Sequence, residues 1–241
     1  MTDLVISLIP LALGIIASPL AIMALVAVLL SARARENGVT YLIGWTVAIV
    51  VVLSLSFLVL ALLGVTERGE PPLWVAWVRL VLGAFLVVAA VVVFRRGRAR
   101  TAAMAVATTP TDVVEAAPQL PGWLHAVDSF TPARSGALGF GIFALNPVDV
   151  SCAVLAAVDI RLGTEASSVA AVVAVLFTIV GVLPIAIPVF LVLVKGERAA
   201  PVLSRLRAWI AKHSIELNAA LLLFIGLIQL QKAIAGLIAG R

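Results

Sequence analysis

The sequence has few charged side chains. Asp, Glu, Lys and Arg make up 12% of the 241 residues, whereas hydrophobic residues make up 63% and the mean hydropathy is +1.21. A soluble domain usually carries about 25% charged residues. This shortage excludes a soluble globular enzyme, because so little charge cannot cover a surface that faces water. The excess of apolar side chains excludes a disordered chain. The composition is that of an integral membrane protein.

Cysteine and histidine are also scarce. Cys152 is the single cysteine, which excludes an intramolecular disulfide, a multi-cysteine metal site and a dithiol electron carrier. His125 and His213 have no carboxylate or cysteine at metal-ligand spacing, and no glycine-rich phosphate-binding loop is present. We therefore expect no cofactor, no metal and no enzymatic activity. The formal charge of +5 does not indicate nucleic acid, because the basic residues lie between apolar runs.

Six apolar runs are long enough to cross a bilayer as helices of about 20 residues. They are apolar on every face, which favours helices over the alternating strands of a membrane barrel. The first run is too long for a signal peptide and follows no basic residue, so we expect it to remain as a mature helix. The predicted fold class is an all-α integral membrane protein whose spans are 4–30, 39–63, 73–94, 136–158, 166–194 and 217–239.

Basic residues predict the orientation. Twelve of the 17 Lys and Arg residues fall in the first, third and fifth connections. Cytoplasmic loops of membrane proteins carry an excess of these residues. The sequence therefore predicts a multi-pass protein with both termini outside, and a bacterial plasma membrane is the expected location.

The two halves of the chain resemble each other. Leu-Gly-Ile-Ile-Ala-Ser-Pro at 13–19 is similar to Phe-Gly-Ile-Phe-Ala-Leu-Asn-Pro at 140–147. In each half an apolar helix, a short polar turn (31–38 or 159–165) and another long helix follow. Because each half has three helices, the second is inserted upside down, as in many secondary transporters. Chance similarity is the alternative, since Gly and Pro are frequent in membrane helices.

This repeat predicts three parts of the chain. Residues 1–96 form the first three-helix repeat, and 136–241 form the second, inverted one. Residues 97–135 are a cytoplasmic linker that is flexible over 101–118. Its later part, 123–130, has the pattern of a short amphipathic helix on the membrane interface.

Two prolines fall at matching positions in the repeat. Pro19 follows Ser18, and Pro147 follows Asn146. A proline within a membrane helix frees carbonyl groups that must find other partners. One interpretation is a pair of simple kinks, and the other is a substrate site built on two broken helices at the repeat interface.

Four further polar residues lie within the predicted spans. Asp149 is about 13 residues into its span, or roughly 20 Å at the helical rise, so it faces a polar cavity, pairs with a cation, or is neutral and hydrogen-bonded to the broken helix. Arg79 and Lys232 each lie about 10 Å below the external surface. They form a cationic station for an anionic group, or they snorkel to the headgroups. Gln229 is placed to add hydrogen bonds to either arrangement.

These motifs resemble one known family. The segments 18–20, 30–38 and 41–45, then Trp123, Asp128, Thr131-Pro132, Gly139 and Asn146-Pro147, are similar to the actinobacterial GAP family. These glycopeptidolipid- and sulfolipid-addressing proteins belong to the LysE transporter superfamily. The resemblance implies two inverted three-helix repeats and movement of cell-envelope glycolipids, with the family's Ser-Pro and Asn-Pro motifs at 18–19 and 146–147. The chain departs from the family after the second motif, where Lys-Asn is often found and Val148-Asp149 stands here.

Three functions follow as hypotheses. The first is a transporter, or transport accessory, for a lipid-linked substrate, with a proton or cation as coupling ion. The second is an exporter of a small cation or amino acid that Asp149 binds. The third is a membrane scaffold for lipid-biosynthesis enzymes. Small residues such as Gly83 and Gly226 permit close helix contact, within a monomer or in a homodimer.

Overall fold

The computed structural model describes residues 2–65, 72–106, 130–164 and 166–239. This part of the chain is helical and contains no strand. The elements are α1 (Thr2–Ile16), α2 (Pro19–Leu29), α3 (Ala34–Leu62), α4 (Leu73–Val106), α6 (Pro132–Ala144), α7 (Pro147–Gly163), α8 (Ser167–Lys195), the 3-10 turn η2 (Gly196–Ala199) and α9 (Ala200–Ala239).

Within the described residues, four helices are long and apolar enough to cross a membrane. They are α3, the part of α4 over Leu73–Arg98, α8 and the part of α9 over Ile215–Ala239. The other two predicted spans are bent pairs rather than continuous helices. α1 and α2 meet at 46°, and α6 and α7 meet at 67°. Counting each bent pair as one span gives the six that the sequence predicts.

Proline explains where the two pairs break. Pro19 is the first residue of α2, and Pro147 is the first residue of α7. A proline at this position has no N–H to donate to the preceding turn, and its fixed φ suits the start of a new helix. In each bent pair, one helix therefore ends just before the proline and the next helix begins at it.

Two expected boundaries differ in the structure. α4 continues to Val106, so the first part of the predicted flexible linker is helical. α7 continues to Gly163, so most of the predicted turn at 159–165 belongs to a helix. The predicted interfacial helix at 123–130 lies outside the described residues except for its last residue. The two expectations that differ came from polar residues, which α4 and α7 accommodate near their ends.

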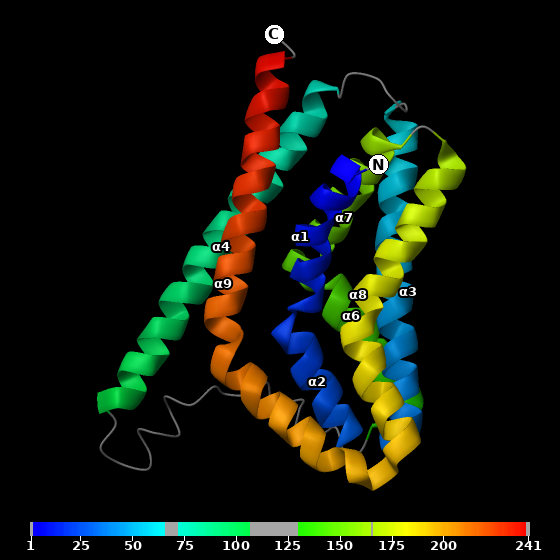
Figure 1. Cartoon of the computed structure of the whole chain (residues 1–241), viewed down its shortest axis with the longest axis vertical. Helices are drawn as coiled ribbons and strands as arrows, with labels where there is room; N and C mark the ends of the chain where they lie inside the picture. Colours follow the sequence, from blue (N-terminus) through cyan, green and yellow to red (C-terminus); the bar gives the residue numbers. More distant parts are fainter. Residues whose placement is uncertain (1, 66–71, 107–129, 165, 240–241) are drawn as a thin grey trace.

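The helices form a bundle with one pair set at its side (Figure 1). α4 and α9 run antiparallel along each other, whereas α1, α3, α7 and α8 pack together. The first part of α9 crosses one end of the molecule before the helix turns along α4. The first and last described residues lie at the opposite end of the molecule, which we call the terminal end. We call the end that α9 crosses the elbow end.

Glycines permit the closest helix contacts. A Cβ atom built on Gly83 would lie 3.1 Å from the Gly226 carbonyl oxygen, so α4 and α9 touch through their backbones. In the same way, a Cβ atom on Gly44 would overlap the carbonyl of Gly136, and one on Gly139 would overlap the carbonyl of Tyr41. Small residues at such crossings are the usual means of association for membrane helices. They fix α6 against α3.

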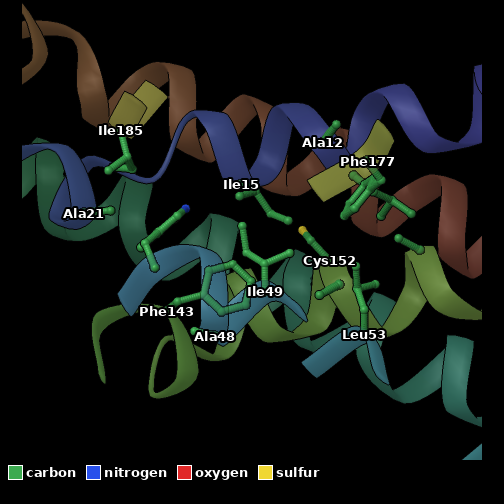
Figure 2. Packing of buried hydrophobic residues seen from close by; sticks show 14 of the residues in the cluster. Ala12, Ile15, Ala21, Ala48, Ile49, Leu53, Phe143, Cys152, Phe177 and Ile185 are labelled. Atoms are coloured by element: carbon green, nitrogen blue, oxygen red, sulfur yellow. The ribbon is translucent and has the colours of Figure 1, made fainter. Parts of the chain in front are cut away.

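Aromatic side chains hold the broken helices in place. Trp45 and Phe143 are fully buried and pack edge to face, with ring centroids 5.0 Å apart. The Tyr41 hydroxyl donates to the Ala21 carbonyl of α2 over 2.9 Å, and Trp45 Nε1 donates to the Gly181 carbonyl of α8 over 3.3 Å. Figure 2 shows this core, where Phe143 lies near Ala48 and Ile49. α3 thus connects α2, α6 and α8.

Candidate functional site: two helix breaks around a buried carboxylate

The two helix breaks meet inside the bundle. Ser18 precedes the first residue of α2, Asn146 precedes the first residue of α7, and Asp149 lies in the first turn of α7. Ser18 Oγ donates to Asp149 Oδ2 over 3.0 Å, and Asn146 Nδ2 donates to the same oxygen over 2.7 Å. These residues of the two halves therefore form one polar cluster, which we call the break cluster.

The start of α7 orients the side chains of this cluster. Asn146 caps the helix, because its Oδ1 accepts from the Val148 N–H over 3.1 Å. Its amide nitrogen is then directed away from the helix end, toward Asp149 and toward Ser18 Oγ at 3.4 Å. A carboxylate in the first turn of a helix is also stabilised by the positive end of the helix dipole.

One oxygen of Asp149 has no hydrogen-bond partner in the part of the chain that the structure describes. The side chain is fully buried, and the hydrogen bonds from Ser18 and Asn146 both end on Oδ2. Within the described residues, Oδ1 is buried and accepts no hydrogen bond. A buried polar atom normally has a partner, since leaving it unpaired costs about 1–3 kcal/mol. Asp149 Oδ1 is therefore the unsatisfied hydrogen-bond acceptor of the break cluster.

The break cluster lines a large cavity. Its volume is about 740 Å³, and most of its wall is aliphatic. Ser18, Asn146 and Asp149 contribute the polar part, together with Asn218 of α9. The cavity lies between the bent pairs and the α4–α9 pair, and its lining is Gly14, Ser18, Pro19, Leu20, Met23, Val93, Ala137, Leu138, Gly141, Ile142, Leu145, Asn146, Pro147, Val148, Asp149, Ile215, Asn218 and Leu222.

Five of the eight predicted site residues thus come together: Ser18, Pro19, Asn146, Pro147 and Asp149 all line this cavity. The other three, Arg79, Gln229 and Lys232, form a different cluster. The sequence allowed Asp149 to face a cavity, to pair with a cation, or to bond to the broken helix. In the structure it lies on a cavity wall and accepts hydrogen bonds from residues at both helix breaks.

The second cluster is centred on Asp159. Arg79 Nη2 lies 2.6 Å from Asp159 Oδ1, and Lys232 Nζ lies 2.8 Å from Asp159 Oδ2. Arg79 Nη1 also donates to Gln229 Oε1 over 3.1 Å. We call these four residues the ion cluster. It joins α4 and α9 to α7, and Arg79 and Asp159 are buried within it.

Asp159 was missed in the sequence analysis. Its position after a long apolar run indicated a loop, whereas it lies on the last turns of α7. Arg79 and Lys232, for which the sequence allowed a cationic station or snorkelling to the headgroups, both contact this carboxylate. The signal that was available is charge: two cations and one acid at similar depth favour a buried ion pair.

The two clusters occupy different levels of α7. Asp149 and Asp159 are ten residues apart on that helix, or about 15 Å along its axis. The ion cluster lies toward the terminal end, and the break cluster lies between it and the elbow end. The cavity extends from the break cluster along residues of α2, α6 and the elbow half of α9.

Another cavity, of about 580 Å³, lies at the elbow end. The turn between α2 and α3 and the connection from α8 to α9 line it, with Arg33, Arg35 and Glu36 as its charged residues. It shares no lining residue with the cavity at the break cluster.

The SfLAP family model, described as Sap, sulfolipid-1-addressing protein, matches residues 8–235. The match includes both helix breaks and the whole of the ion cluster. Comparison with curated proteins and with solved structures gave no match.

Proposed function

The chain belongs to the sulfolipid-1-addressing protein family, and from that premise we propose that it is a secondary-type membrane transporter, or transport accessory, for an amphipathic cell-envelope lipid. The substrate is a glycolipid or a lipid-linked precursor. The chain moves it across a bacterial plasma membrane in which both termini lie outside.

The cavity at the break cluster carries this proposal. An amphipathic lipid needs an apolar wall for its chains and a few polar groups for its headgroup, and the cavity supplies both. Ligand sites are typically of this kind, mostly apolar with a small number of placed polar groups. Broken helices that meet inside a membrane are also how secondary transporters build their substrate sites.

The ion cluster supports a transporter state in which the path from the cavity to the terminal end is closed. It ties the α4–α9 pair to α7 above the cavity, through one carboxylate and two cations. We propose that this contact opens and closes while the two inverted repeats rock around the break cluster. Asp149 supplies the coupling charge, because it is the acidic residue on the cavity wall and links both breaks.

A small-cation or amino-acid exporter is the second candidate. The free Oδ1 of Asp149 favours it, since a buried carboxylate oxygen is suited to bind a cation or an ammonium group. The size and aliphatic lining of the cavity favour a lipid, because a small hydrophilic solute would leave most of that wall uncovered.

Flipping of a labelled lipid in proteoliposomes tests the proposal. We expect wild-type protein to move a fluorescent glycolipid between leaflets, measured by its protection from a membrane-impermeant quencher. Asp149→Asn keeps the shape of the side chain, and we expect it to lower the rate at least about tenfold, which corresponds to 1.4 kcal/mol in the barrier.

Ser7→Ala is the matched control, because the Ser7 hydroxyl bonds to the Leu4 carbonyl of its own helix and the residue lines neither of the two cavities described above. Its rate should equal that of the wild type. Lipid movement by Asp149→Asn at the wild-type rate would contradict the proposed role of the break cluster. Movement of ions but not of lipid would favour the second candidate.

A further inference from the structure

We infer that the cavity at the elbow end, which we call the elbow cavity, binds the phosphate of an anionic membrane lipid. This site goes beyond the proposed function, because it shares no lining residue with the cavity at the break cluster. Its volume of about 580 Å³ is within the usual range of ligand pockets.

The elbow cavity lies where two membrane spans end. α3 is a candidate span from Ala34 onward, and α8 is one up to Lys195. The cavity is lined by Arg33 and Arg35 at the start of α3 and by Gly196 directly after α8. It is therefore at the level where apolar spans give way to polar residues, which is where a bilayer places its lipid headgroups.

Two arginines give the elbow cavity a positive charge. Arg33 and Arg35 line it together with one acidic residue, Glu36. A guanidinium presents several N–H donors in a plane and can bind two phosphate oxygens at once. The chain from the end of α8 into α9 adds to this charge, since 195–212 contains five Lys or Arg residues and one acidic residue. An anionic group is therefore attracted to this end of the molecule.

The Arg35 guanidinium is placed against the end of α8. A Cβ atom built on Gly196 would lie 3.3 Å from Arg35 Nη2. Gly196 has a φ of +54°, which L side chains rarely adopt, so this turn favours glycine and leaves room for the guanidinium. A phosphate held by Arg33 and Arg35 therefore lies between the turn that begins α3 and the turn that ends α8.

The start of α3 adds to the attraction of the two arginines. Arg33 is the N-cap residue, and no side-chain hydrogen bond from it caps the helix. The N–H groups of a first turn carry a partial positive charge and favour an anion nearby. Residues 34–36 of that turn line the elbow cavity.

Apolar side chains beside the elbow cavity distinguish a lipid from a free anion. Leu30 lines the cavity and is 41% exposed. Val194, two residues before Gly196, is 66% exposed, and Val202, next to the lining residue Leu203, is 45% exposed. Acyl chains cover such aliphatic groups favourably, whereas a phosphate ion leaves them uncovered. The occupant is therefore a lipid that carries its charge on a phosphate.

Native mass spectrometry of the full chain, purified in detergent, measures this binding directly. The probes are phosphatidylglycerol and phosphatidylcholine with the same chains, and inorganic phosphate is the competitor. We expect the wild type to bind phosphatidylglycerol at least about fivefold more tightly, because the arginines repel the choline group. Millimolar inorganic phosphate should not displace the bound lipid, because the ion has no chains.

Variants that change the charge of the elbow cavity should change this affinity in opposite directions. We expect Arg33→Gln to weaken phosphatidylglycerol binding about fivefold, the usual effect of one cation beside anionic lipid, and the double variant Arg33→Gln, Arg35→Gln to weaken it about twentyfold. Glu36→Gln removes the acidic residue of the lining and should strengthen binding several-fold.

Arg96→Gln is the matched control, because it removes an exposed arginine of α4 that does not line the elbow cavity. Its affinity for phosphatidylglycerol should equal that of the wild type. Thermal unfolding verifies that each variant is folded. If the loss of Arg35 loosens the end of α8, Arg33→Gln alone still tests the site.

Several results would overturn the inference. They are equal binding of the two lipids by the wild type, unchanged phosphatidylglycerol binding by folded Arg33→Gln, and an equal loss in Arg96→Gln, which would reflect net charge alone. Displacement of the lipid by inorganic phosphate would replace the lipid with a free anion as the ligand. The proposed function is tested at Asp149, which does not line the elbow cavity, so the two can fail separately.

Discussion

Ser18 Oγ donates to Asp149 Oδ2 over 3.0 Å, although 131 residues separate the two in the chain. The bond joins the break between α1 and α2 to the first turn of α7. Any movement of one bent pair relative to the other therefore lengthens this bond or carries both pairs together. The break cluster is thus placed to couple ligand binding to the arrangement of the two halves.

The Ser18 hydroxyl should contribute measurably to transport. A hydrogen bond to a charged group contributes about 1.5–3 kcal/mol, and we expect Ser18→Ala to lower the lipid-flipping rate by about tenfold or more. Ser7→Ala provides the comparison. Equal rates for the two alanine variants would mean that this bond does not contribute.

Filling the cavity should block transport without unfolding the protein. A Cβ atom on Gly141 meets no atom within 4 Å, and Gly141 lines the cavity. We expect Gly141→Trp to occupy the space of the lipid and to abolish lipid movement, while Gly141→Ala leaves the rate unchanged. Thermal unfolding should show both variants folded. Wild-type flipping by a folded Gly141→Trp would place the lipid path elsewhere.

The contact between α3 and α6 should tolerate no added carbon. A Cβ atom on Gly44 would overlap the Gly136 carbonyl, so Gly44→Ala must push the two helices apart. Overpacking of this kind costs about 1–3 kcal/mol, and we expect a lower midpoint of thermal unfolding. Gly141→Ala is the control, because it adds the same methyl group on α6 where space is open. Equal midpoints would contradict the close approach.

The sequence predicted the helices well because a bilayer requires long apolar runs. In the described residues the helical class is confirmed, and four of the predicted runs form single helices long and apolar enough to cross a membrane. Membership of the lipid-addressing family is also confirmed. Pro19 and Pro147 also indicated correctly where helices break, since proline cannot continue the preceding turn. The inverted arrangement of six spans and the LysE superfamily placement stay predictions.

The pairing of polar residues was harder to predict. Ser18 and Asp149 could be assigned to one site because the repeat places both beside a break. For Asp159 the sequence offers only a signal of charge, because its partners Arg79 and Lys232 are distant in the chain and the packing of α4 and α9 brings them together. Boundaries near polar residues, such as the end of α7, were misplaced for the same reason.

The ion cluster leads to a prediction about stability. Removing one partner of a buried ion pair leaves an uncompensated charge and costs about 3–5 kcal/mol. We expect Asp159→Asn to lower the thermal midpoint strongly, because Arg79 would stay buried next to a neutral group. A triple variant, Arg79→Met, Asp159→Leu and Lys232→Met, replaces every charge by an apolar side chain.

This triple variant should recover most of the stability that Asp159→Asn loses, since well-packed apolar residues often replace buried ion pairs at little cost. It should nevertheless change the flipping rate, because apolar contacts cannot reproduce the charged contact that ties α4 and α9 to α7. A triple variant with wild-type stability and wild-type flipping would show that the ion cluster takes no part in closing the terminal end. A triple variant less stable than Asp159→Asn would show that it acts as a stabilising contact in its own right.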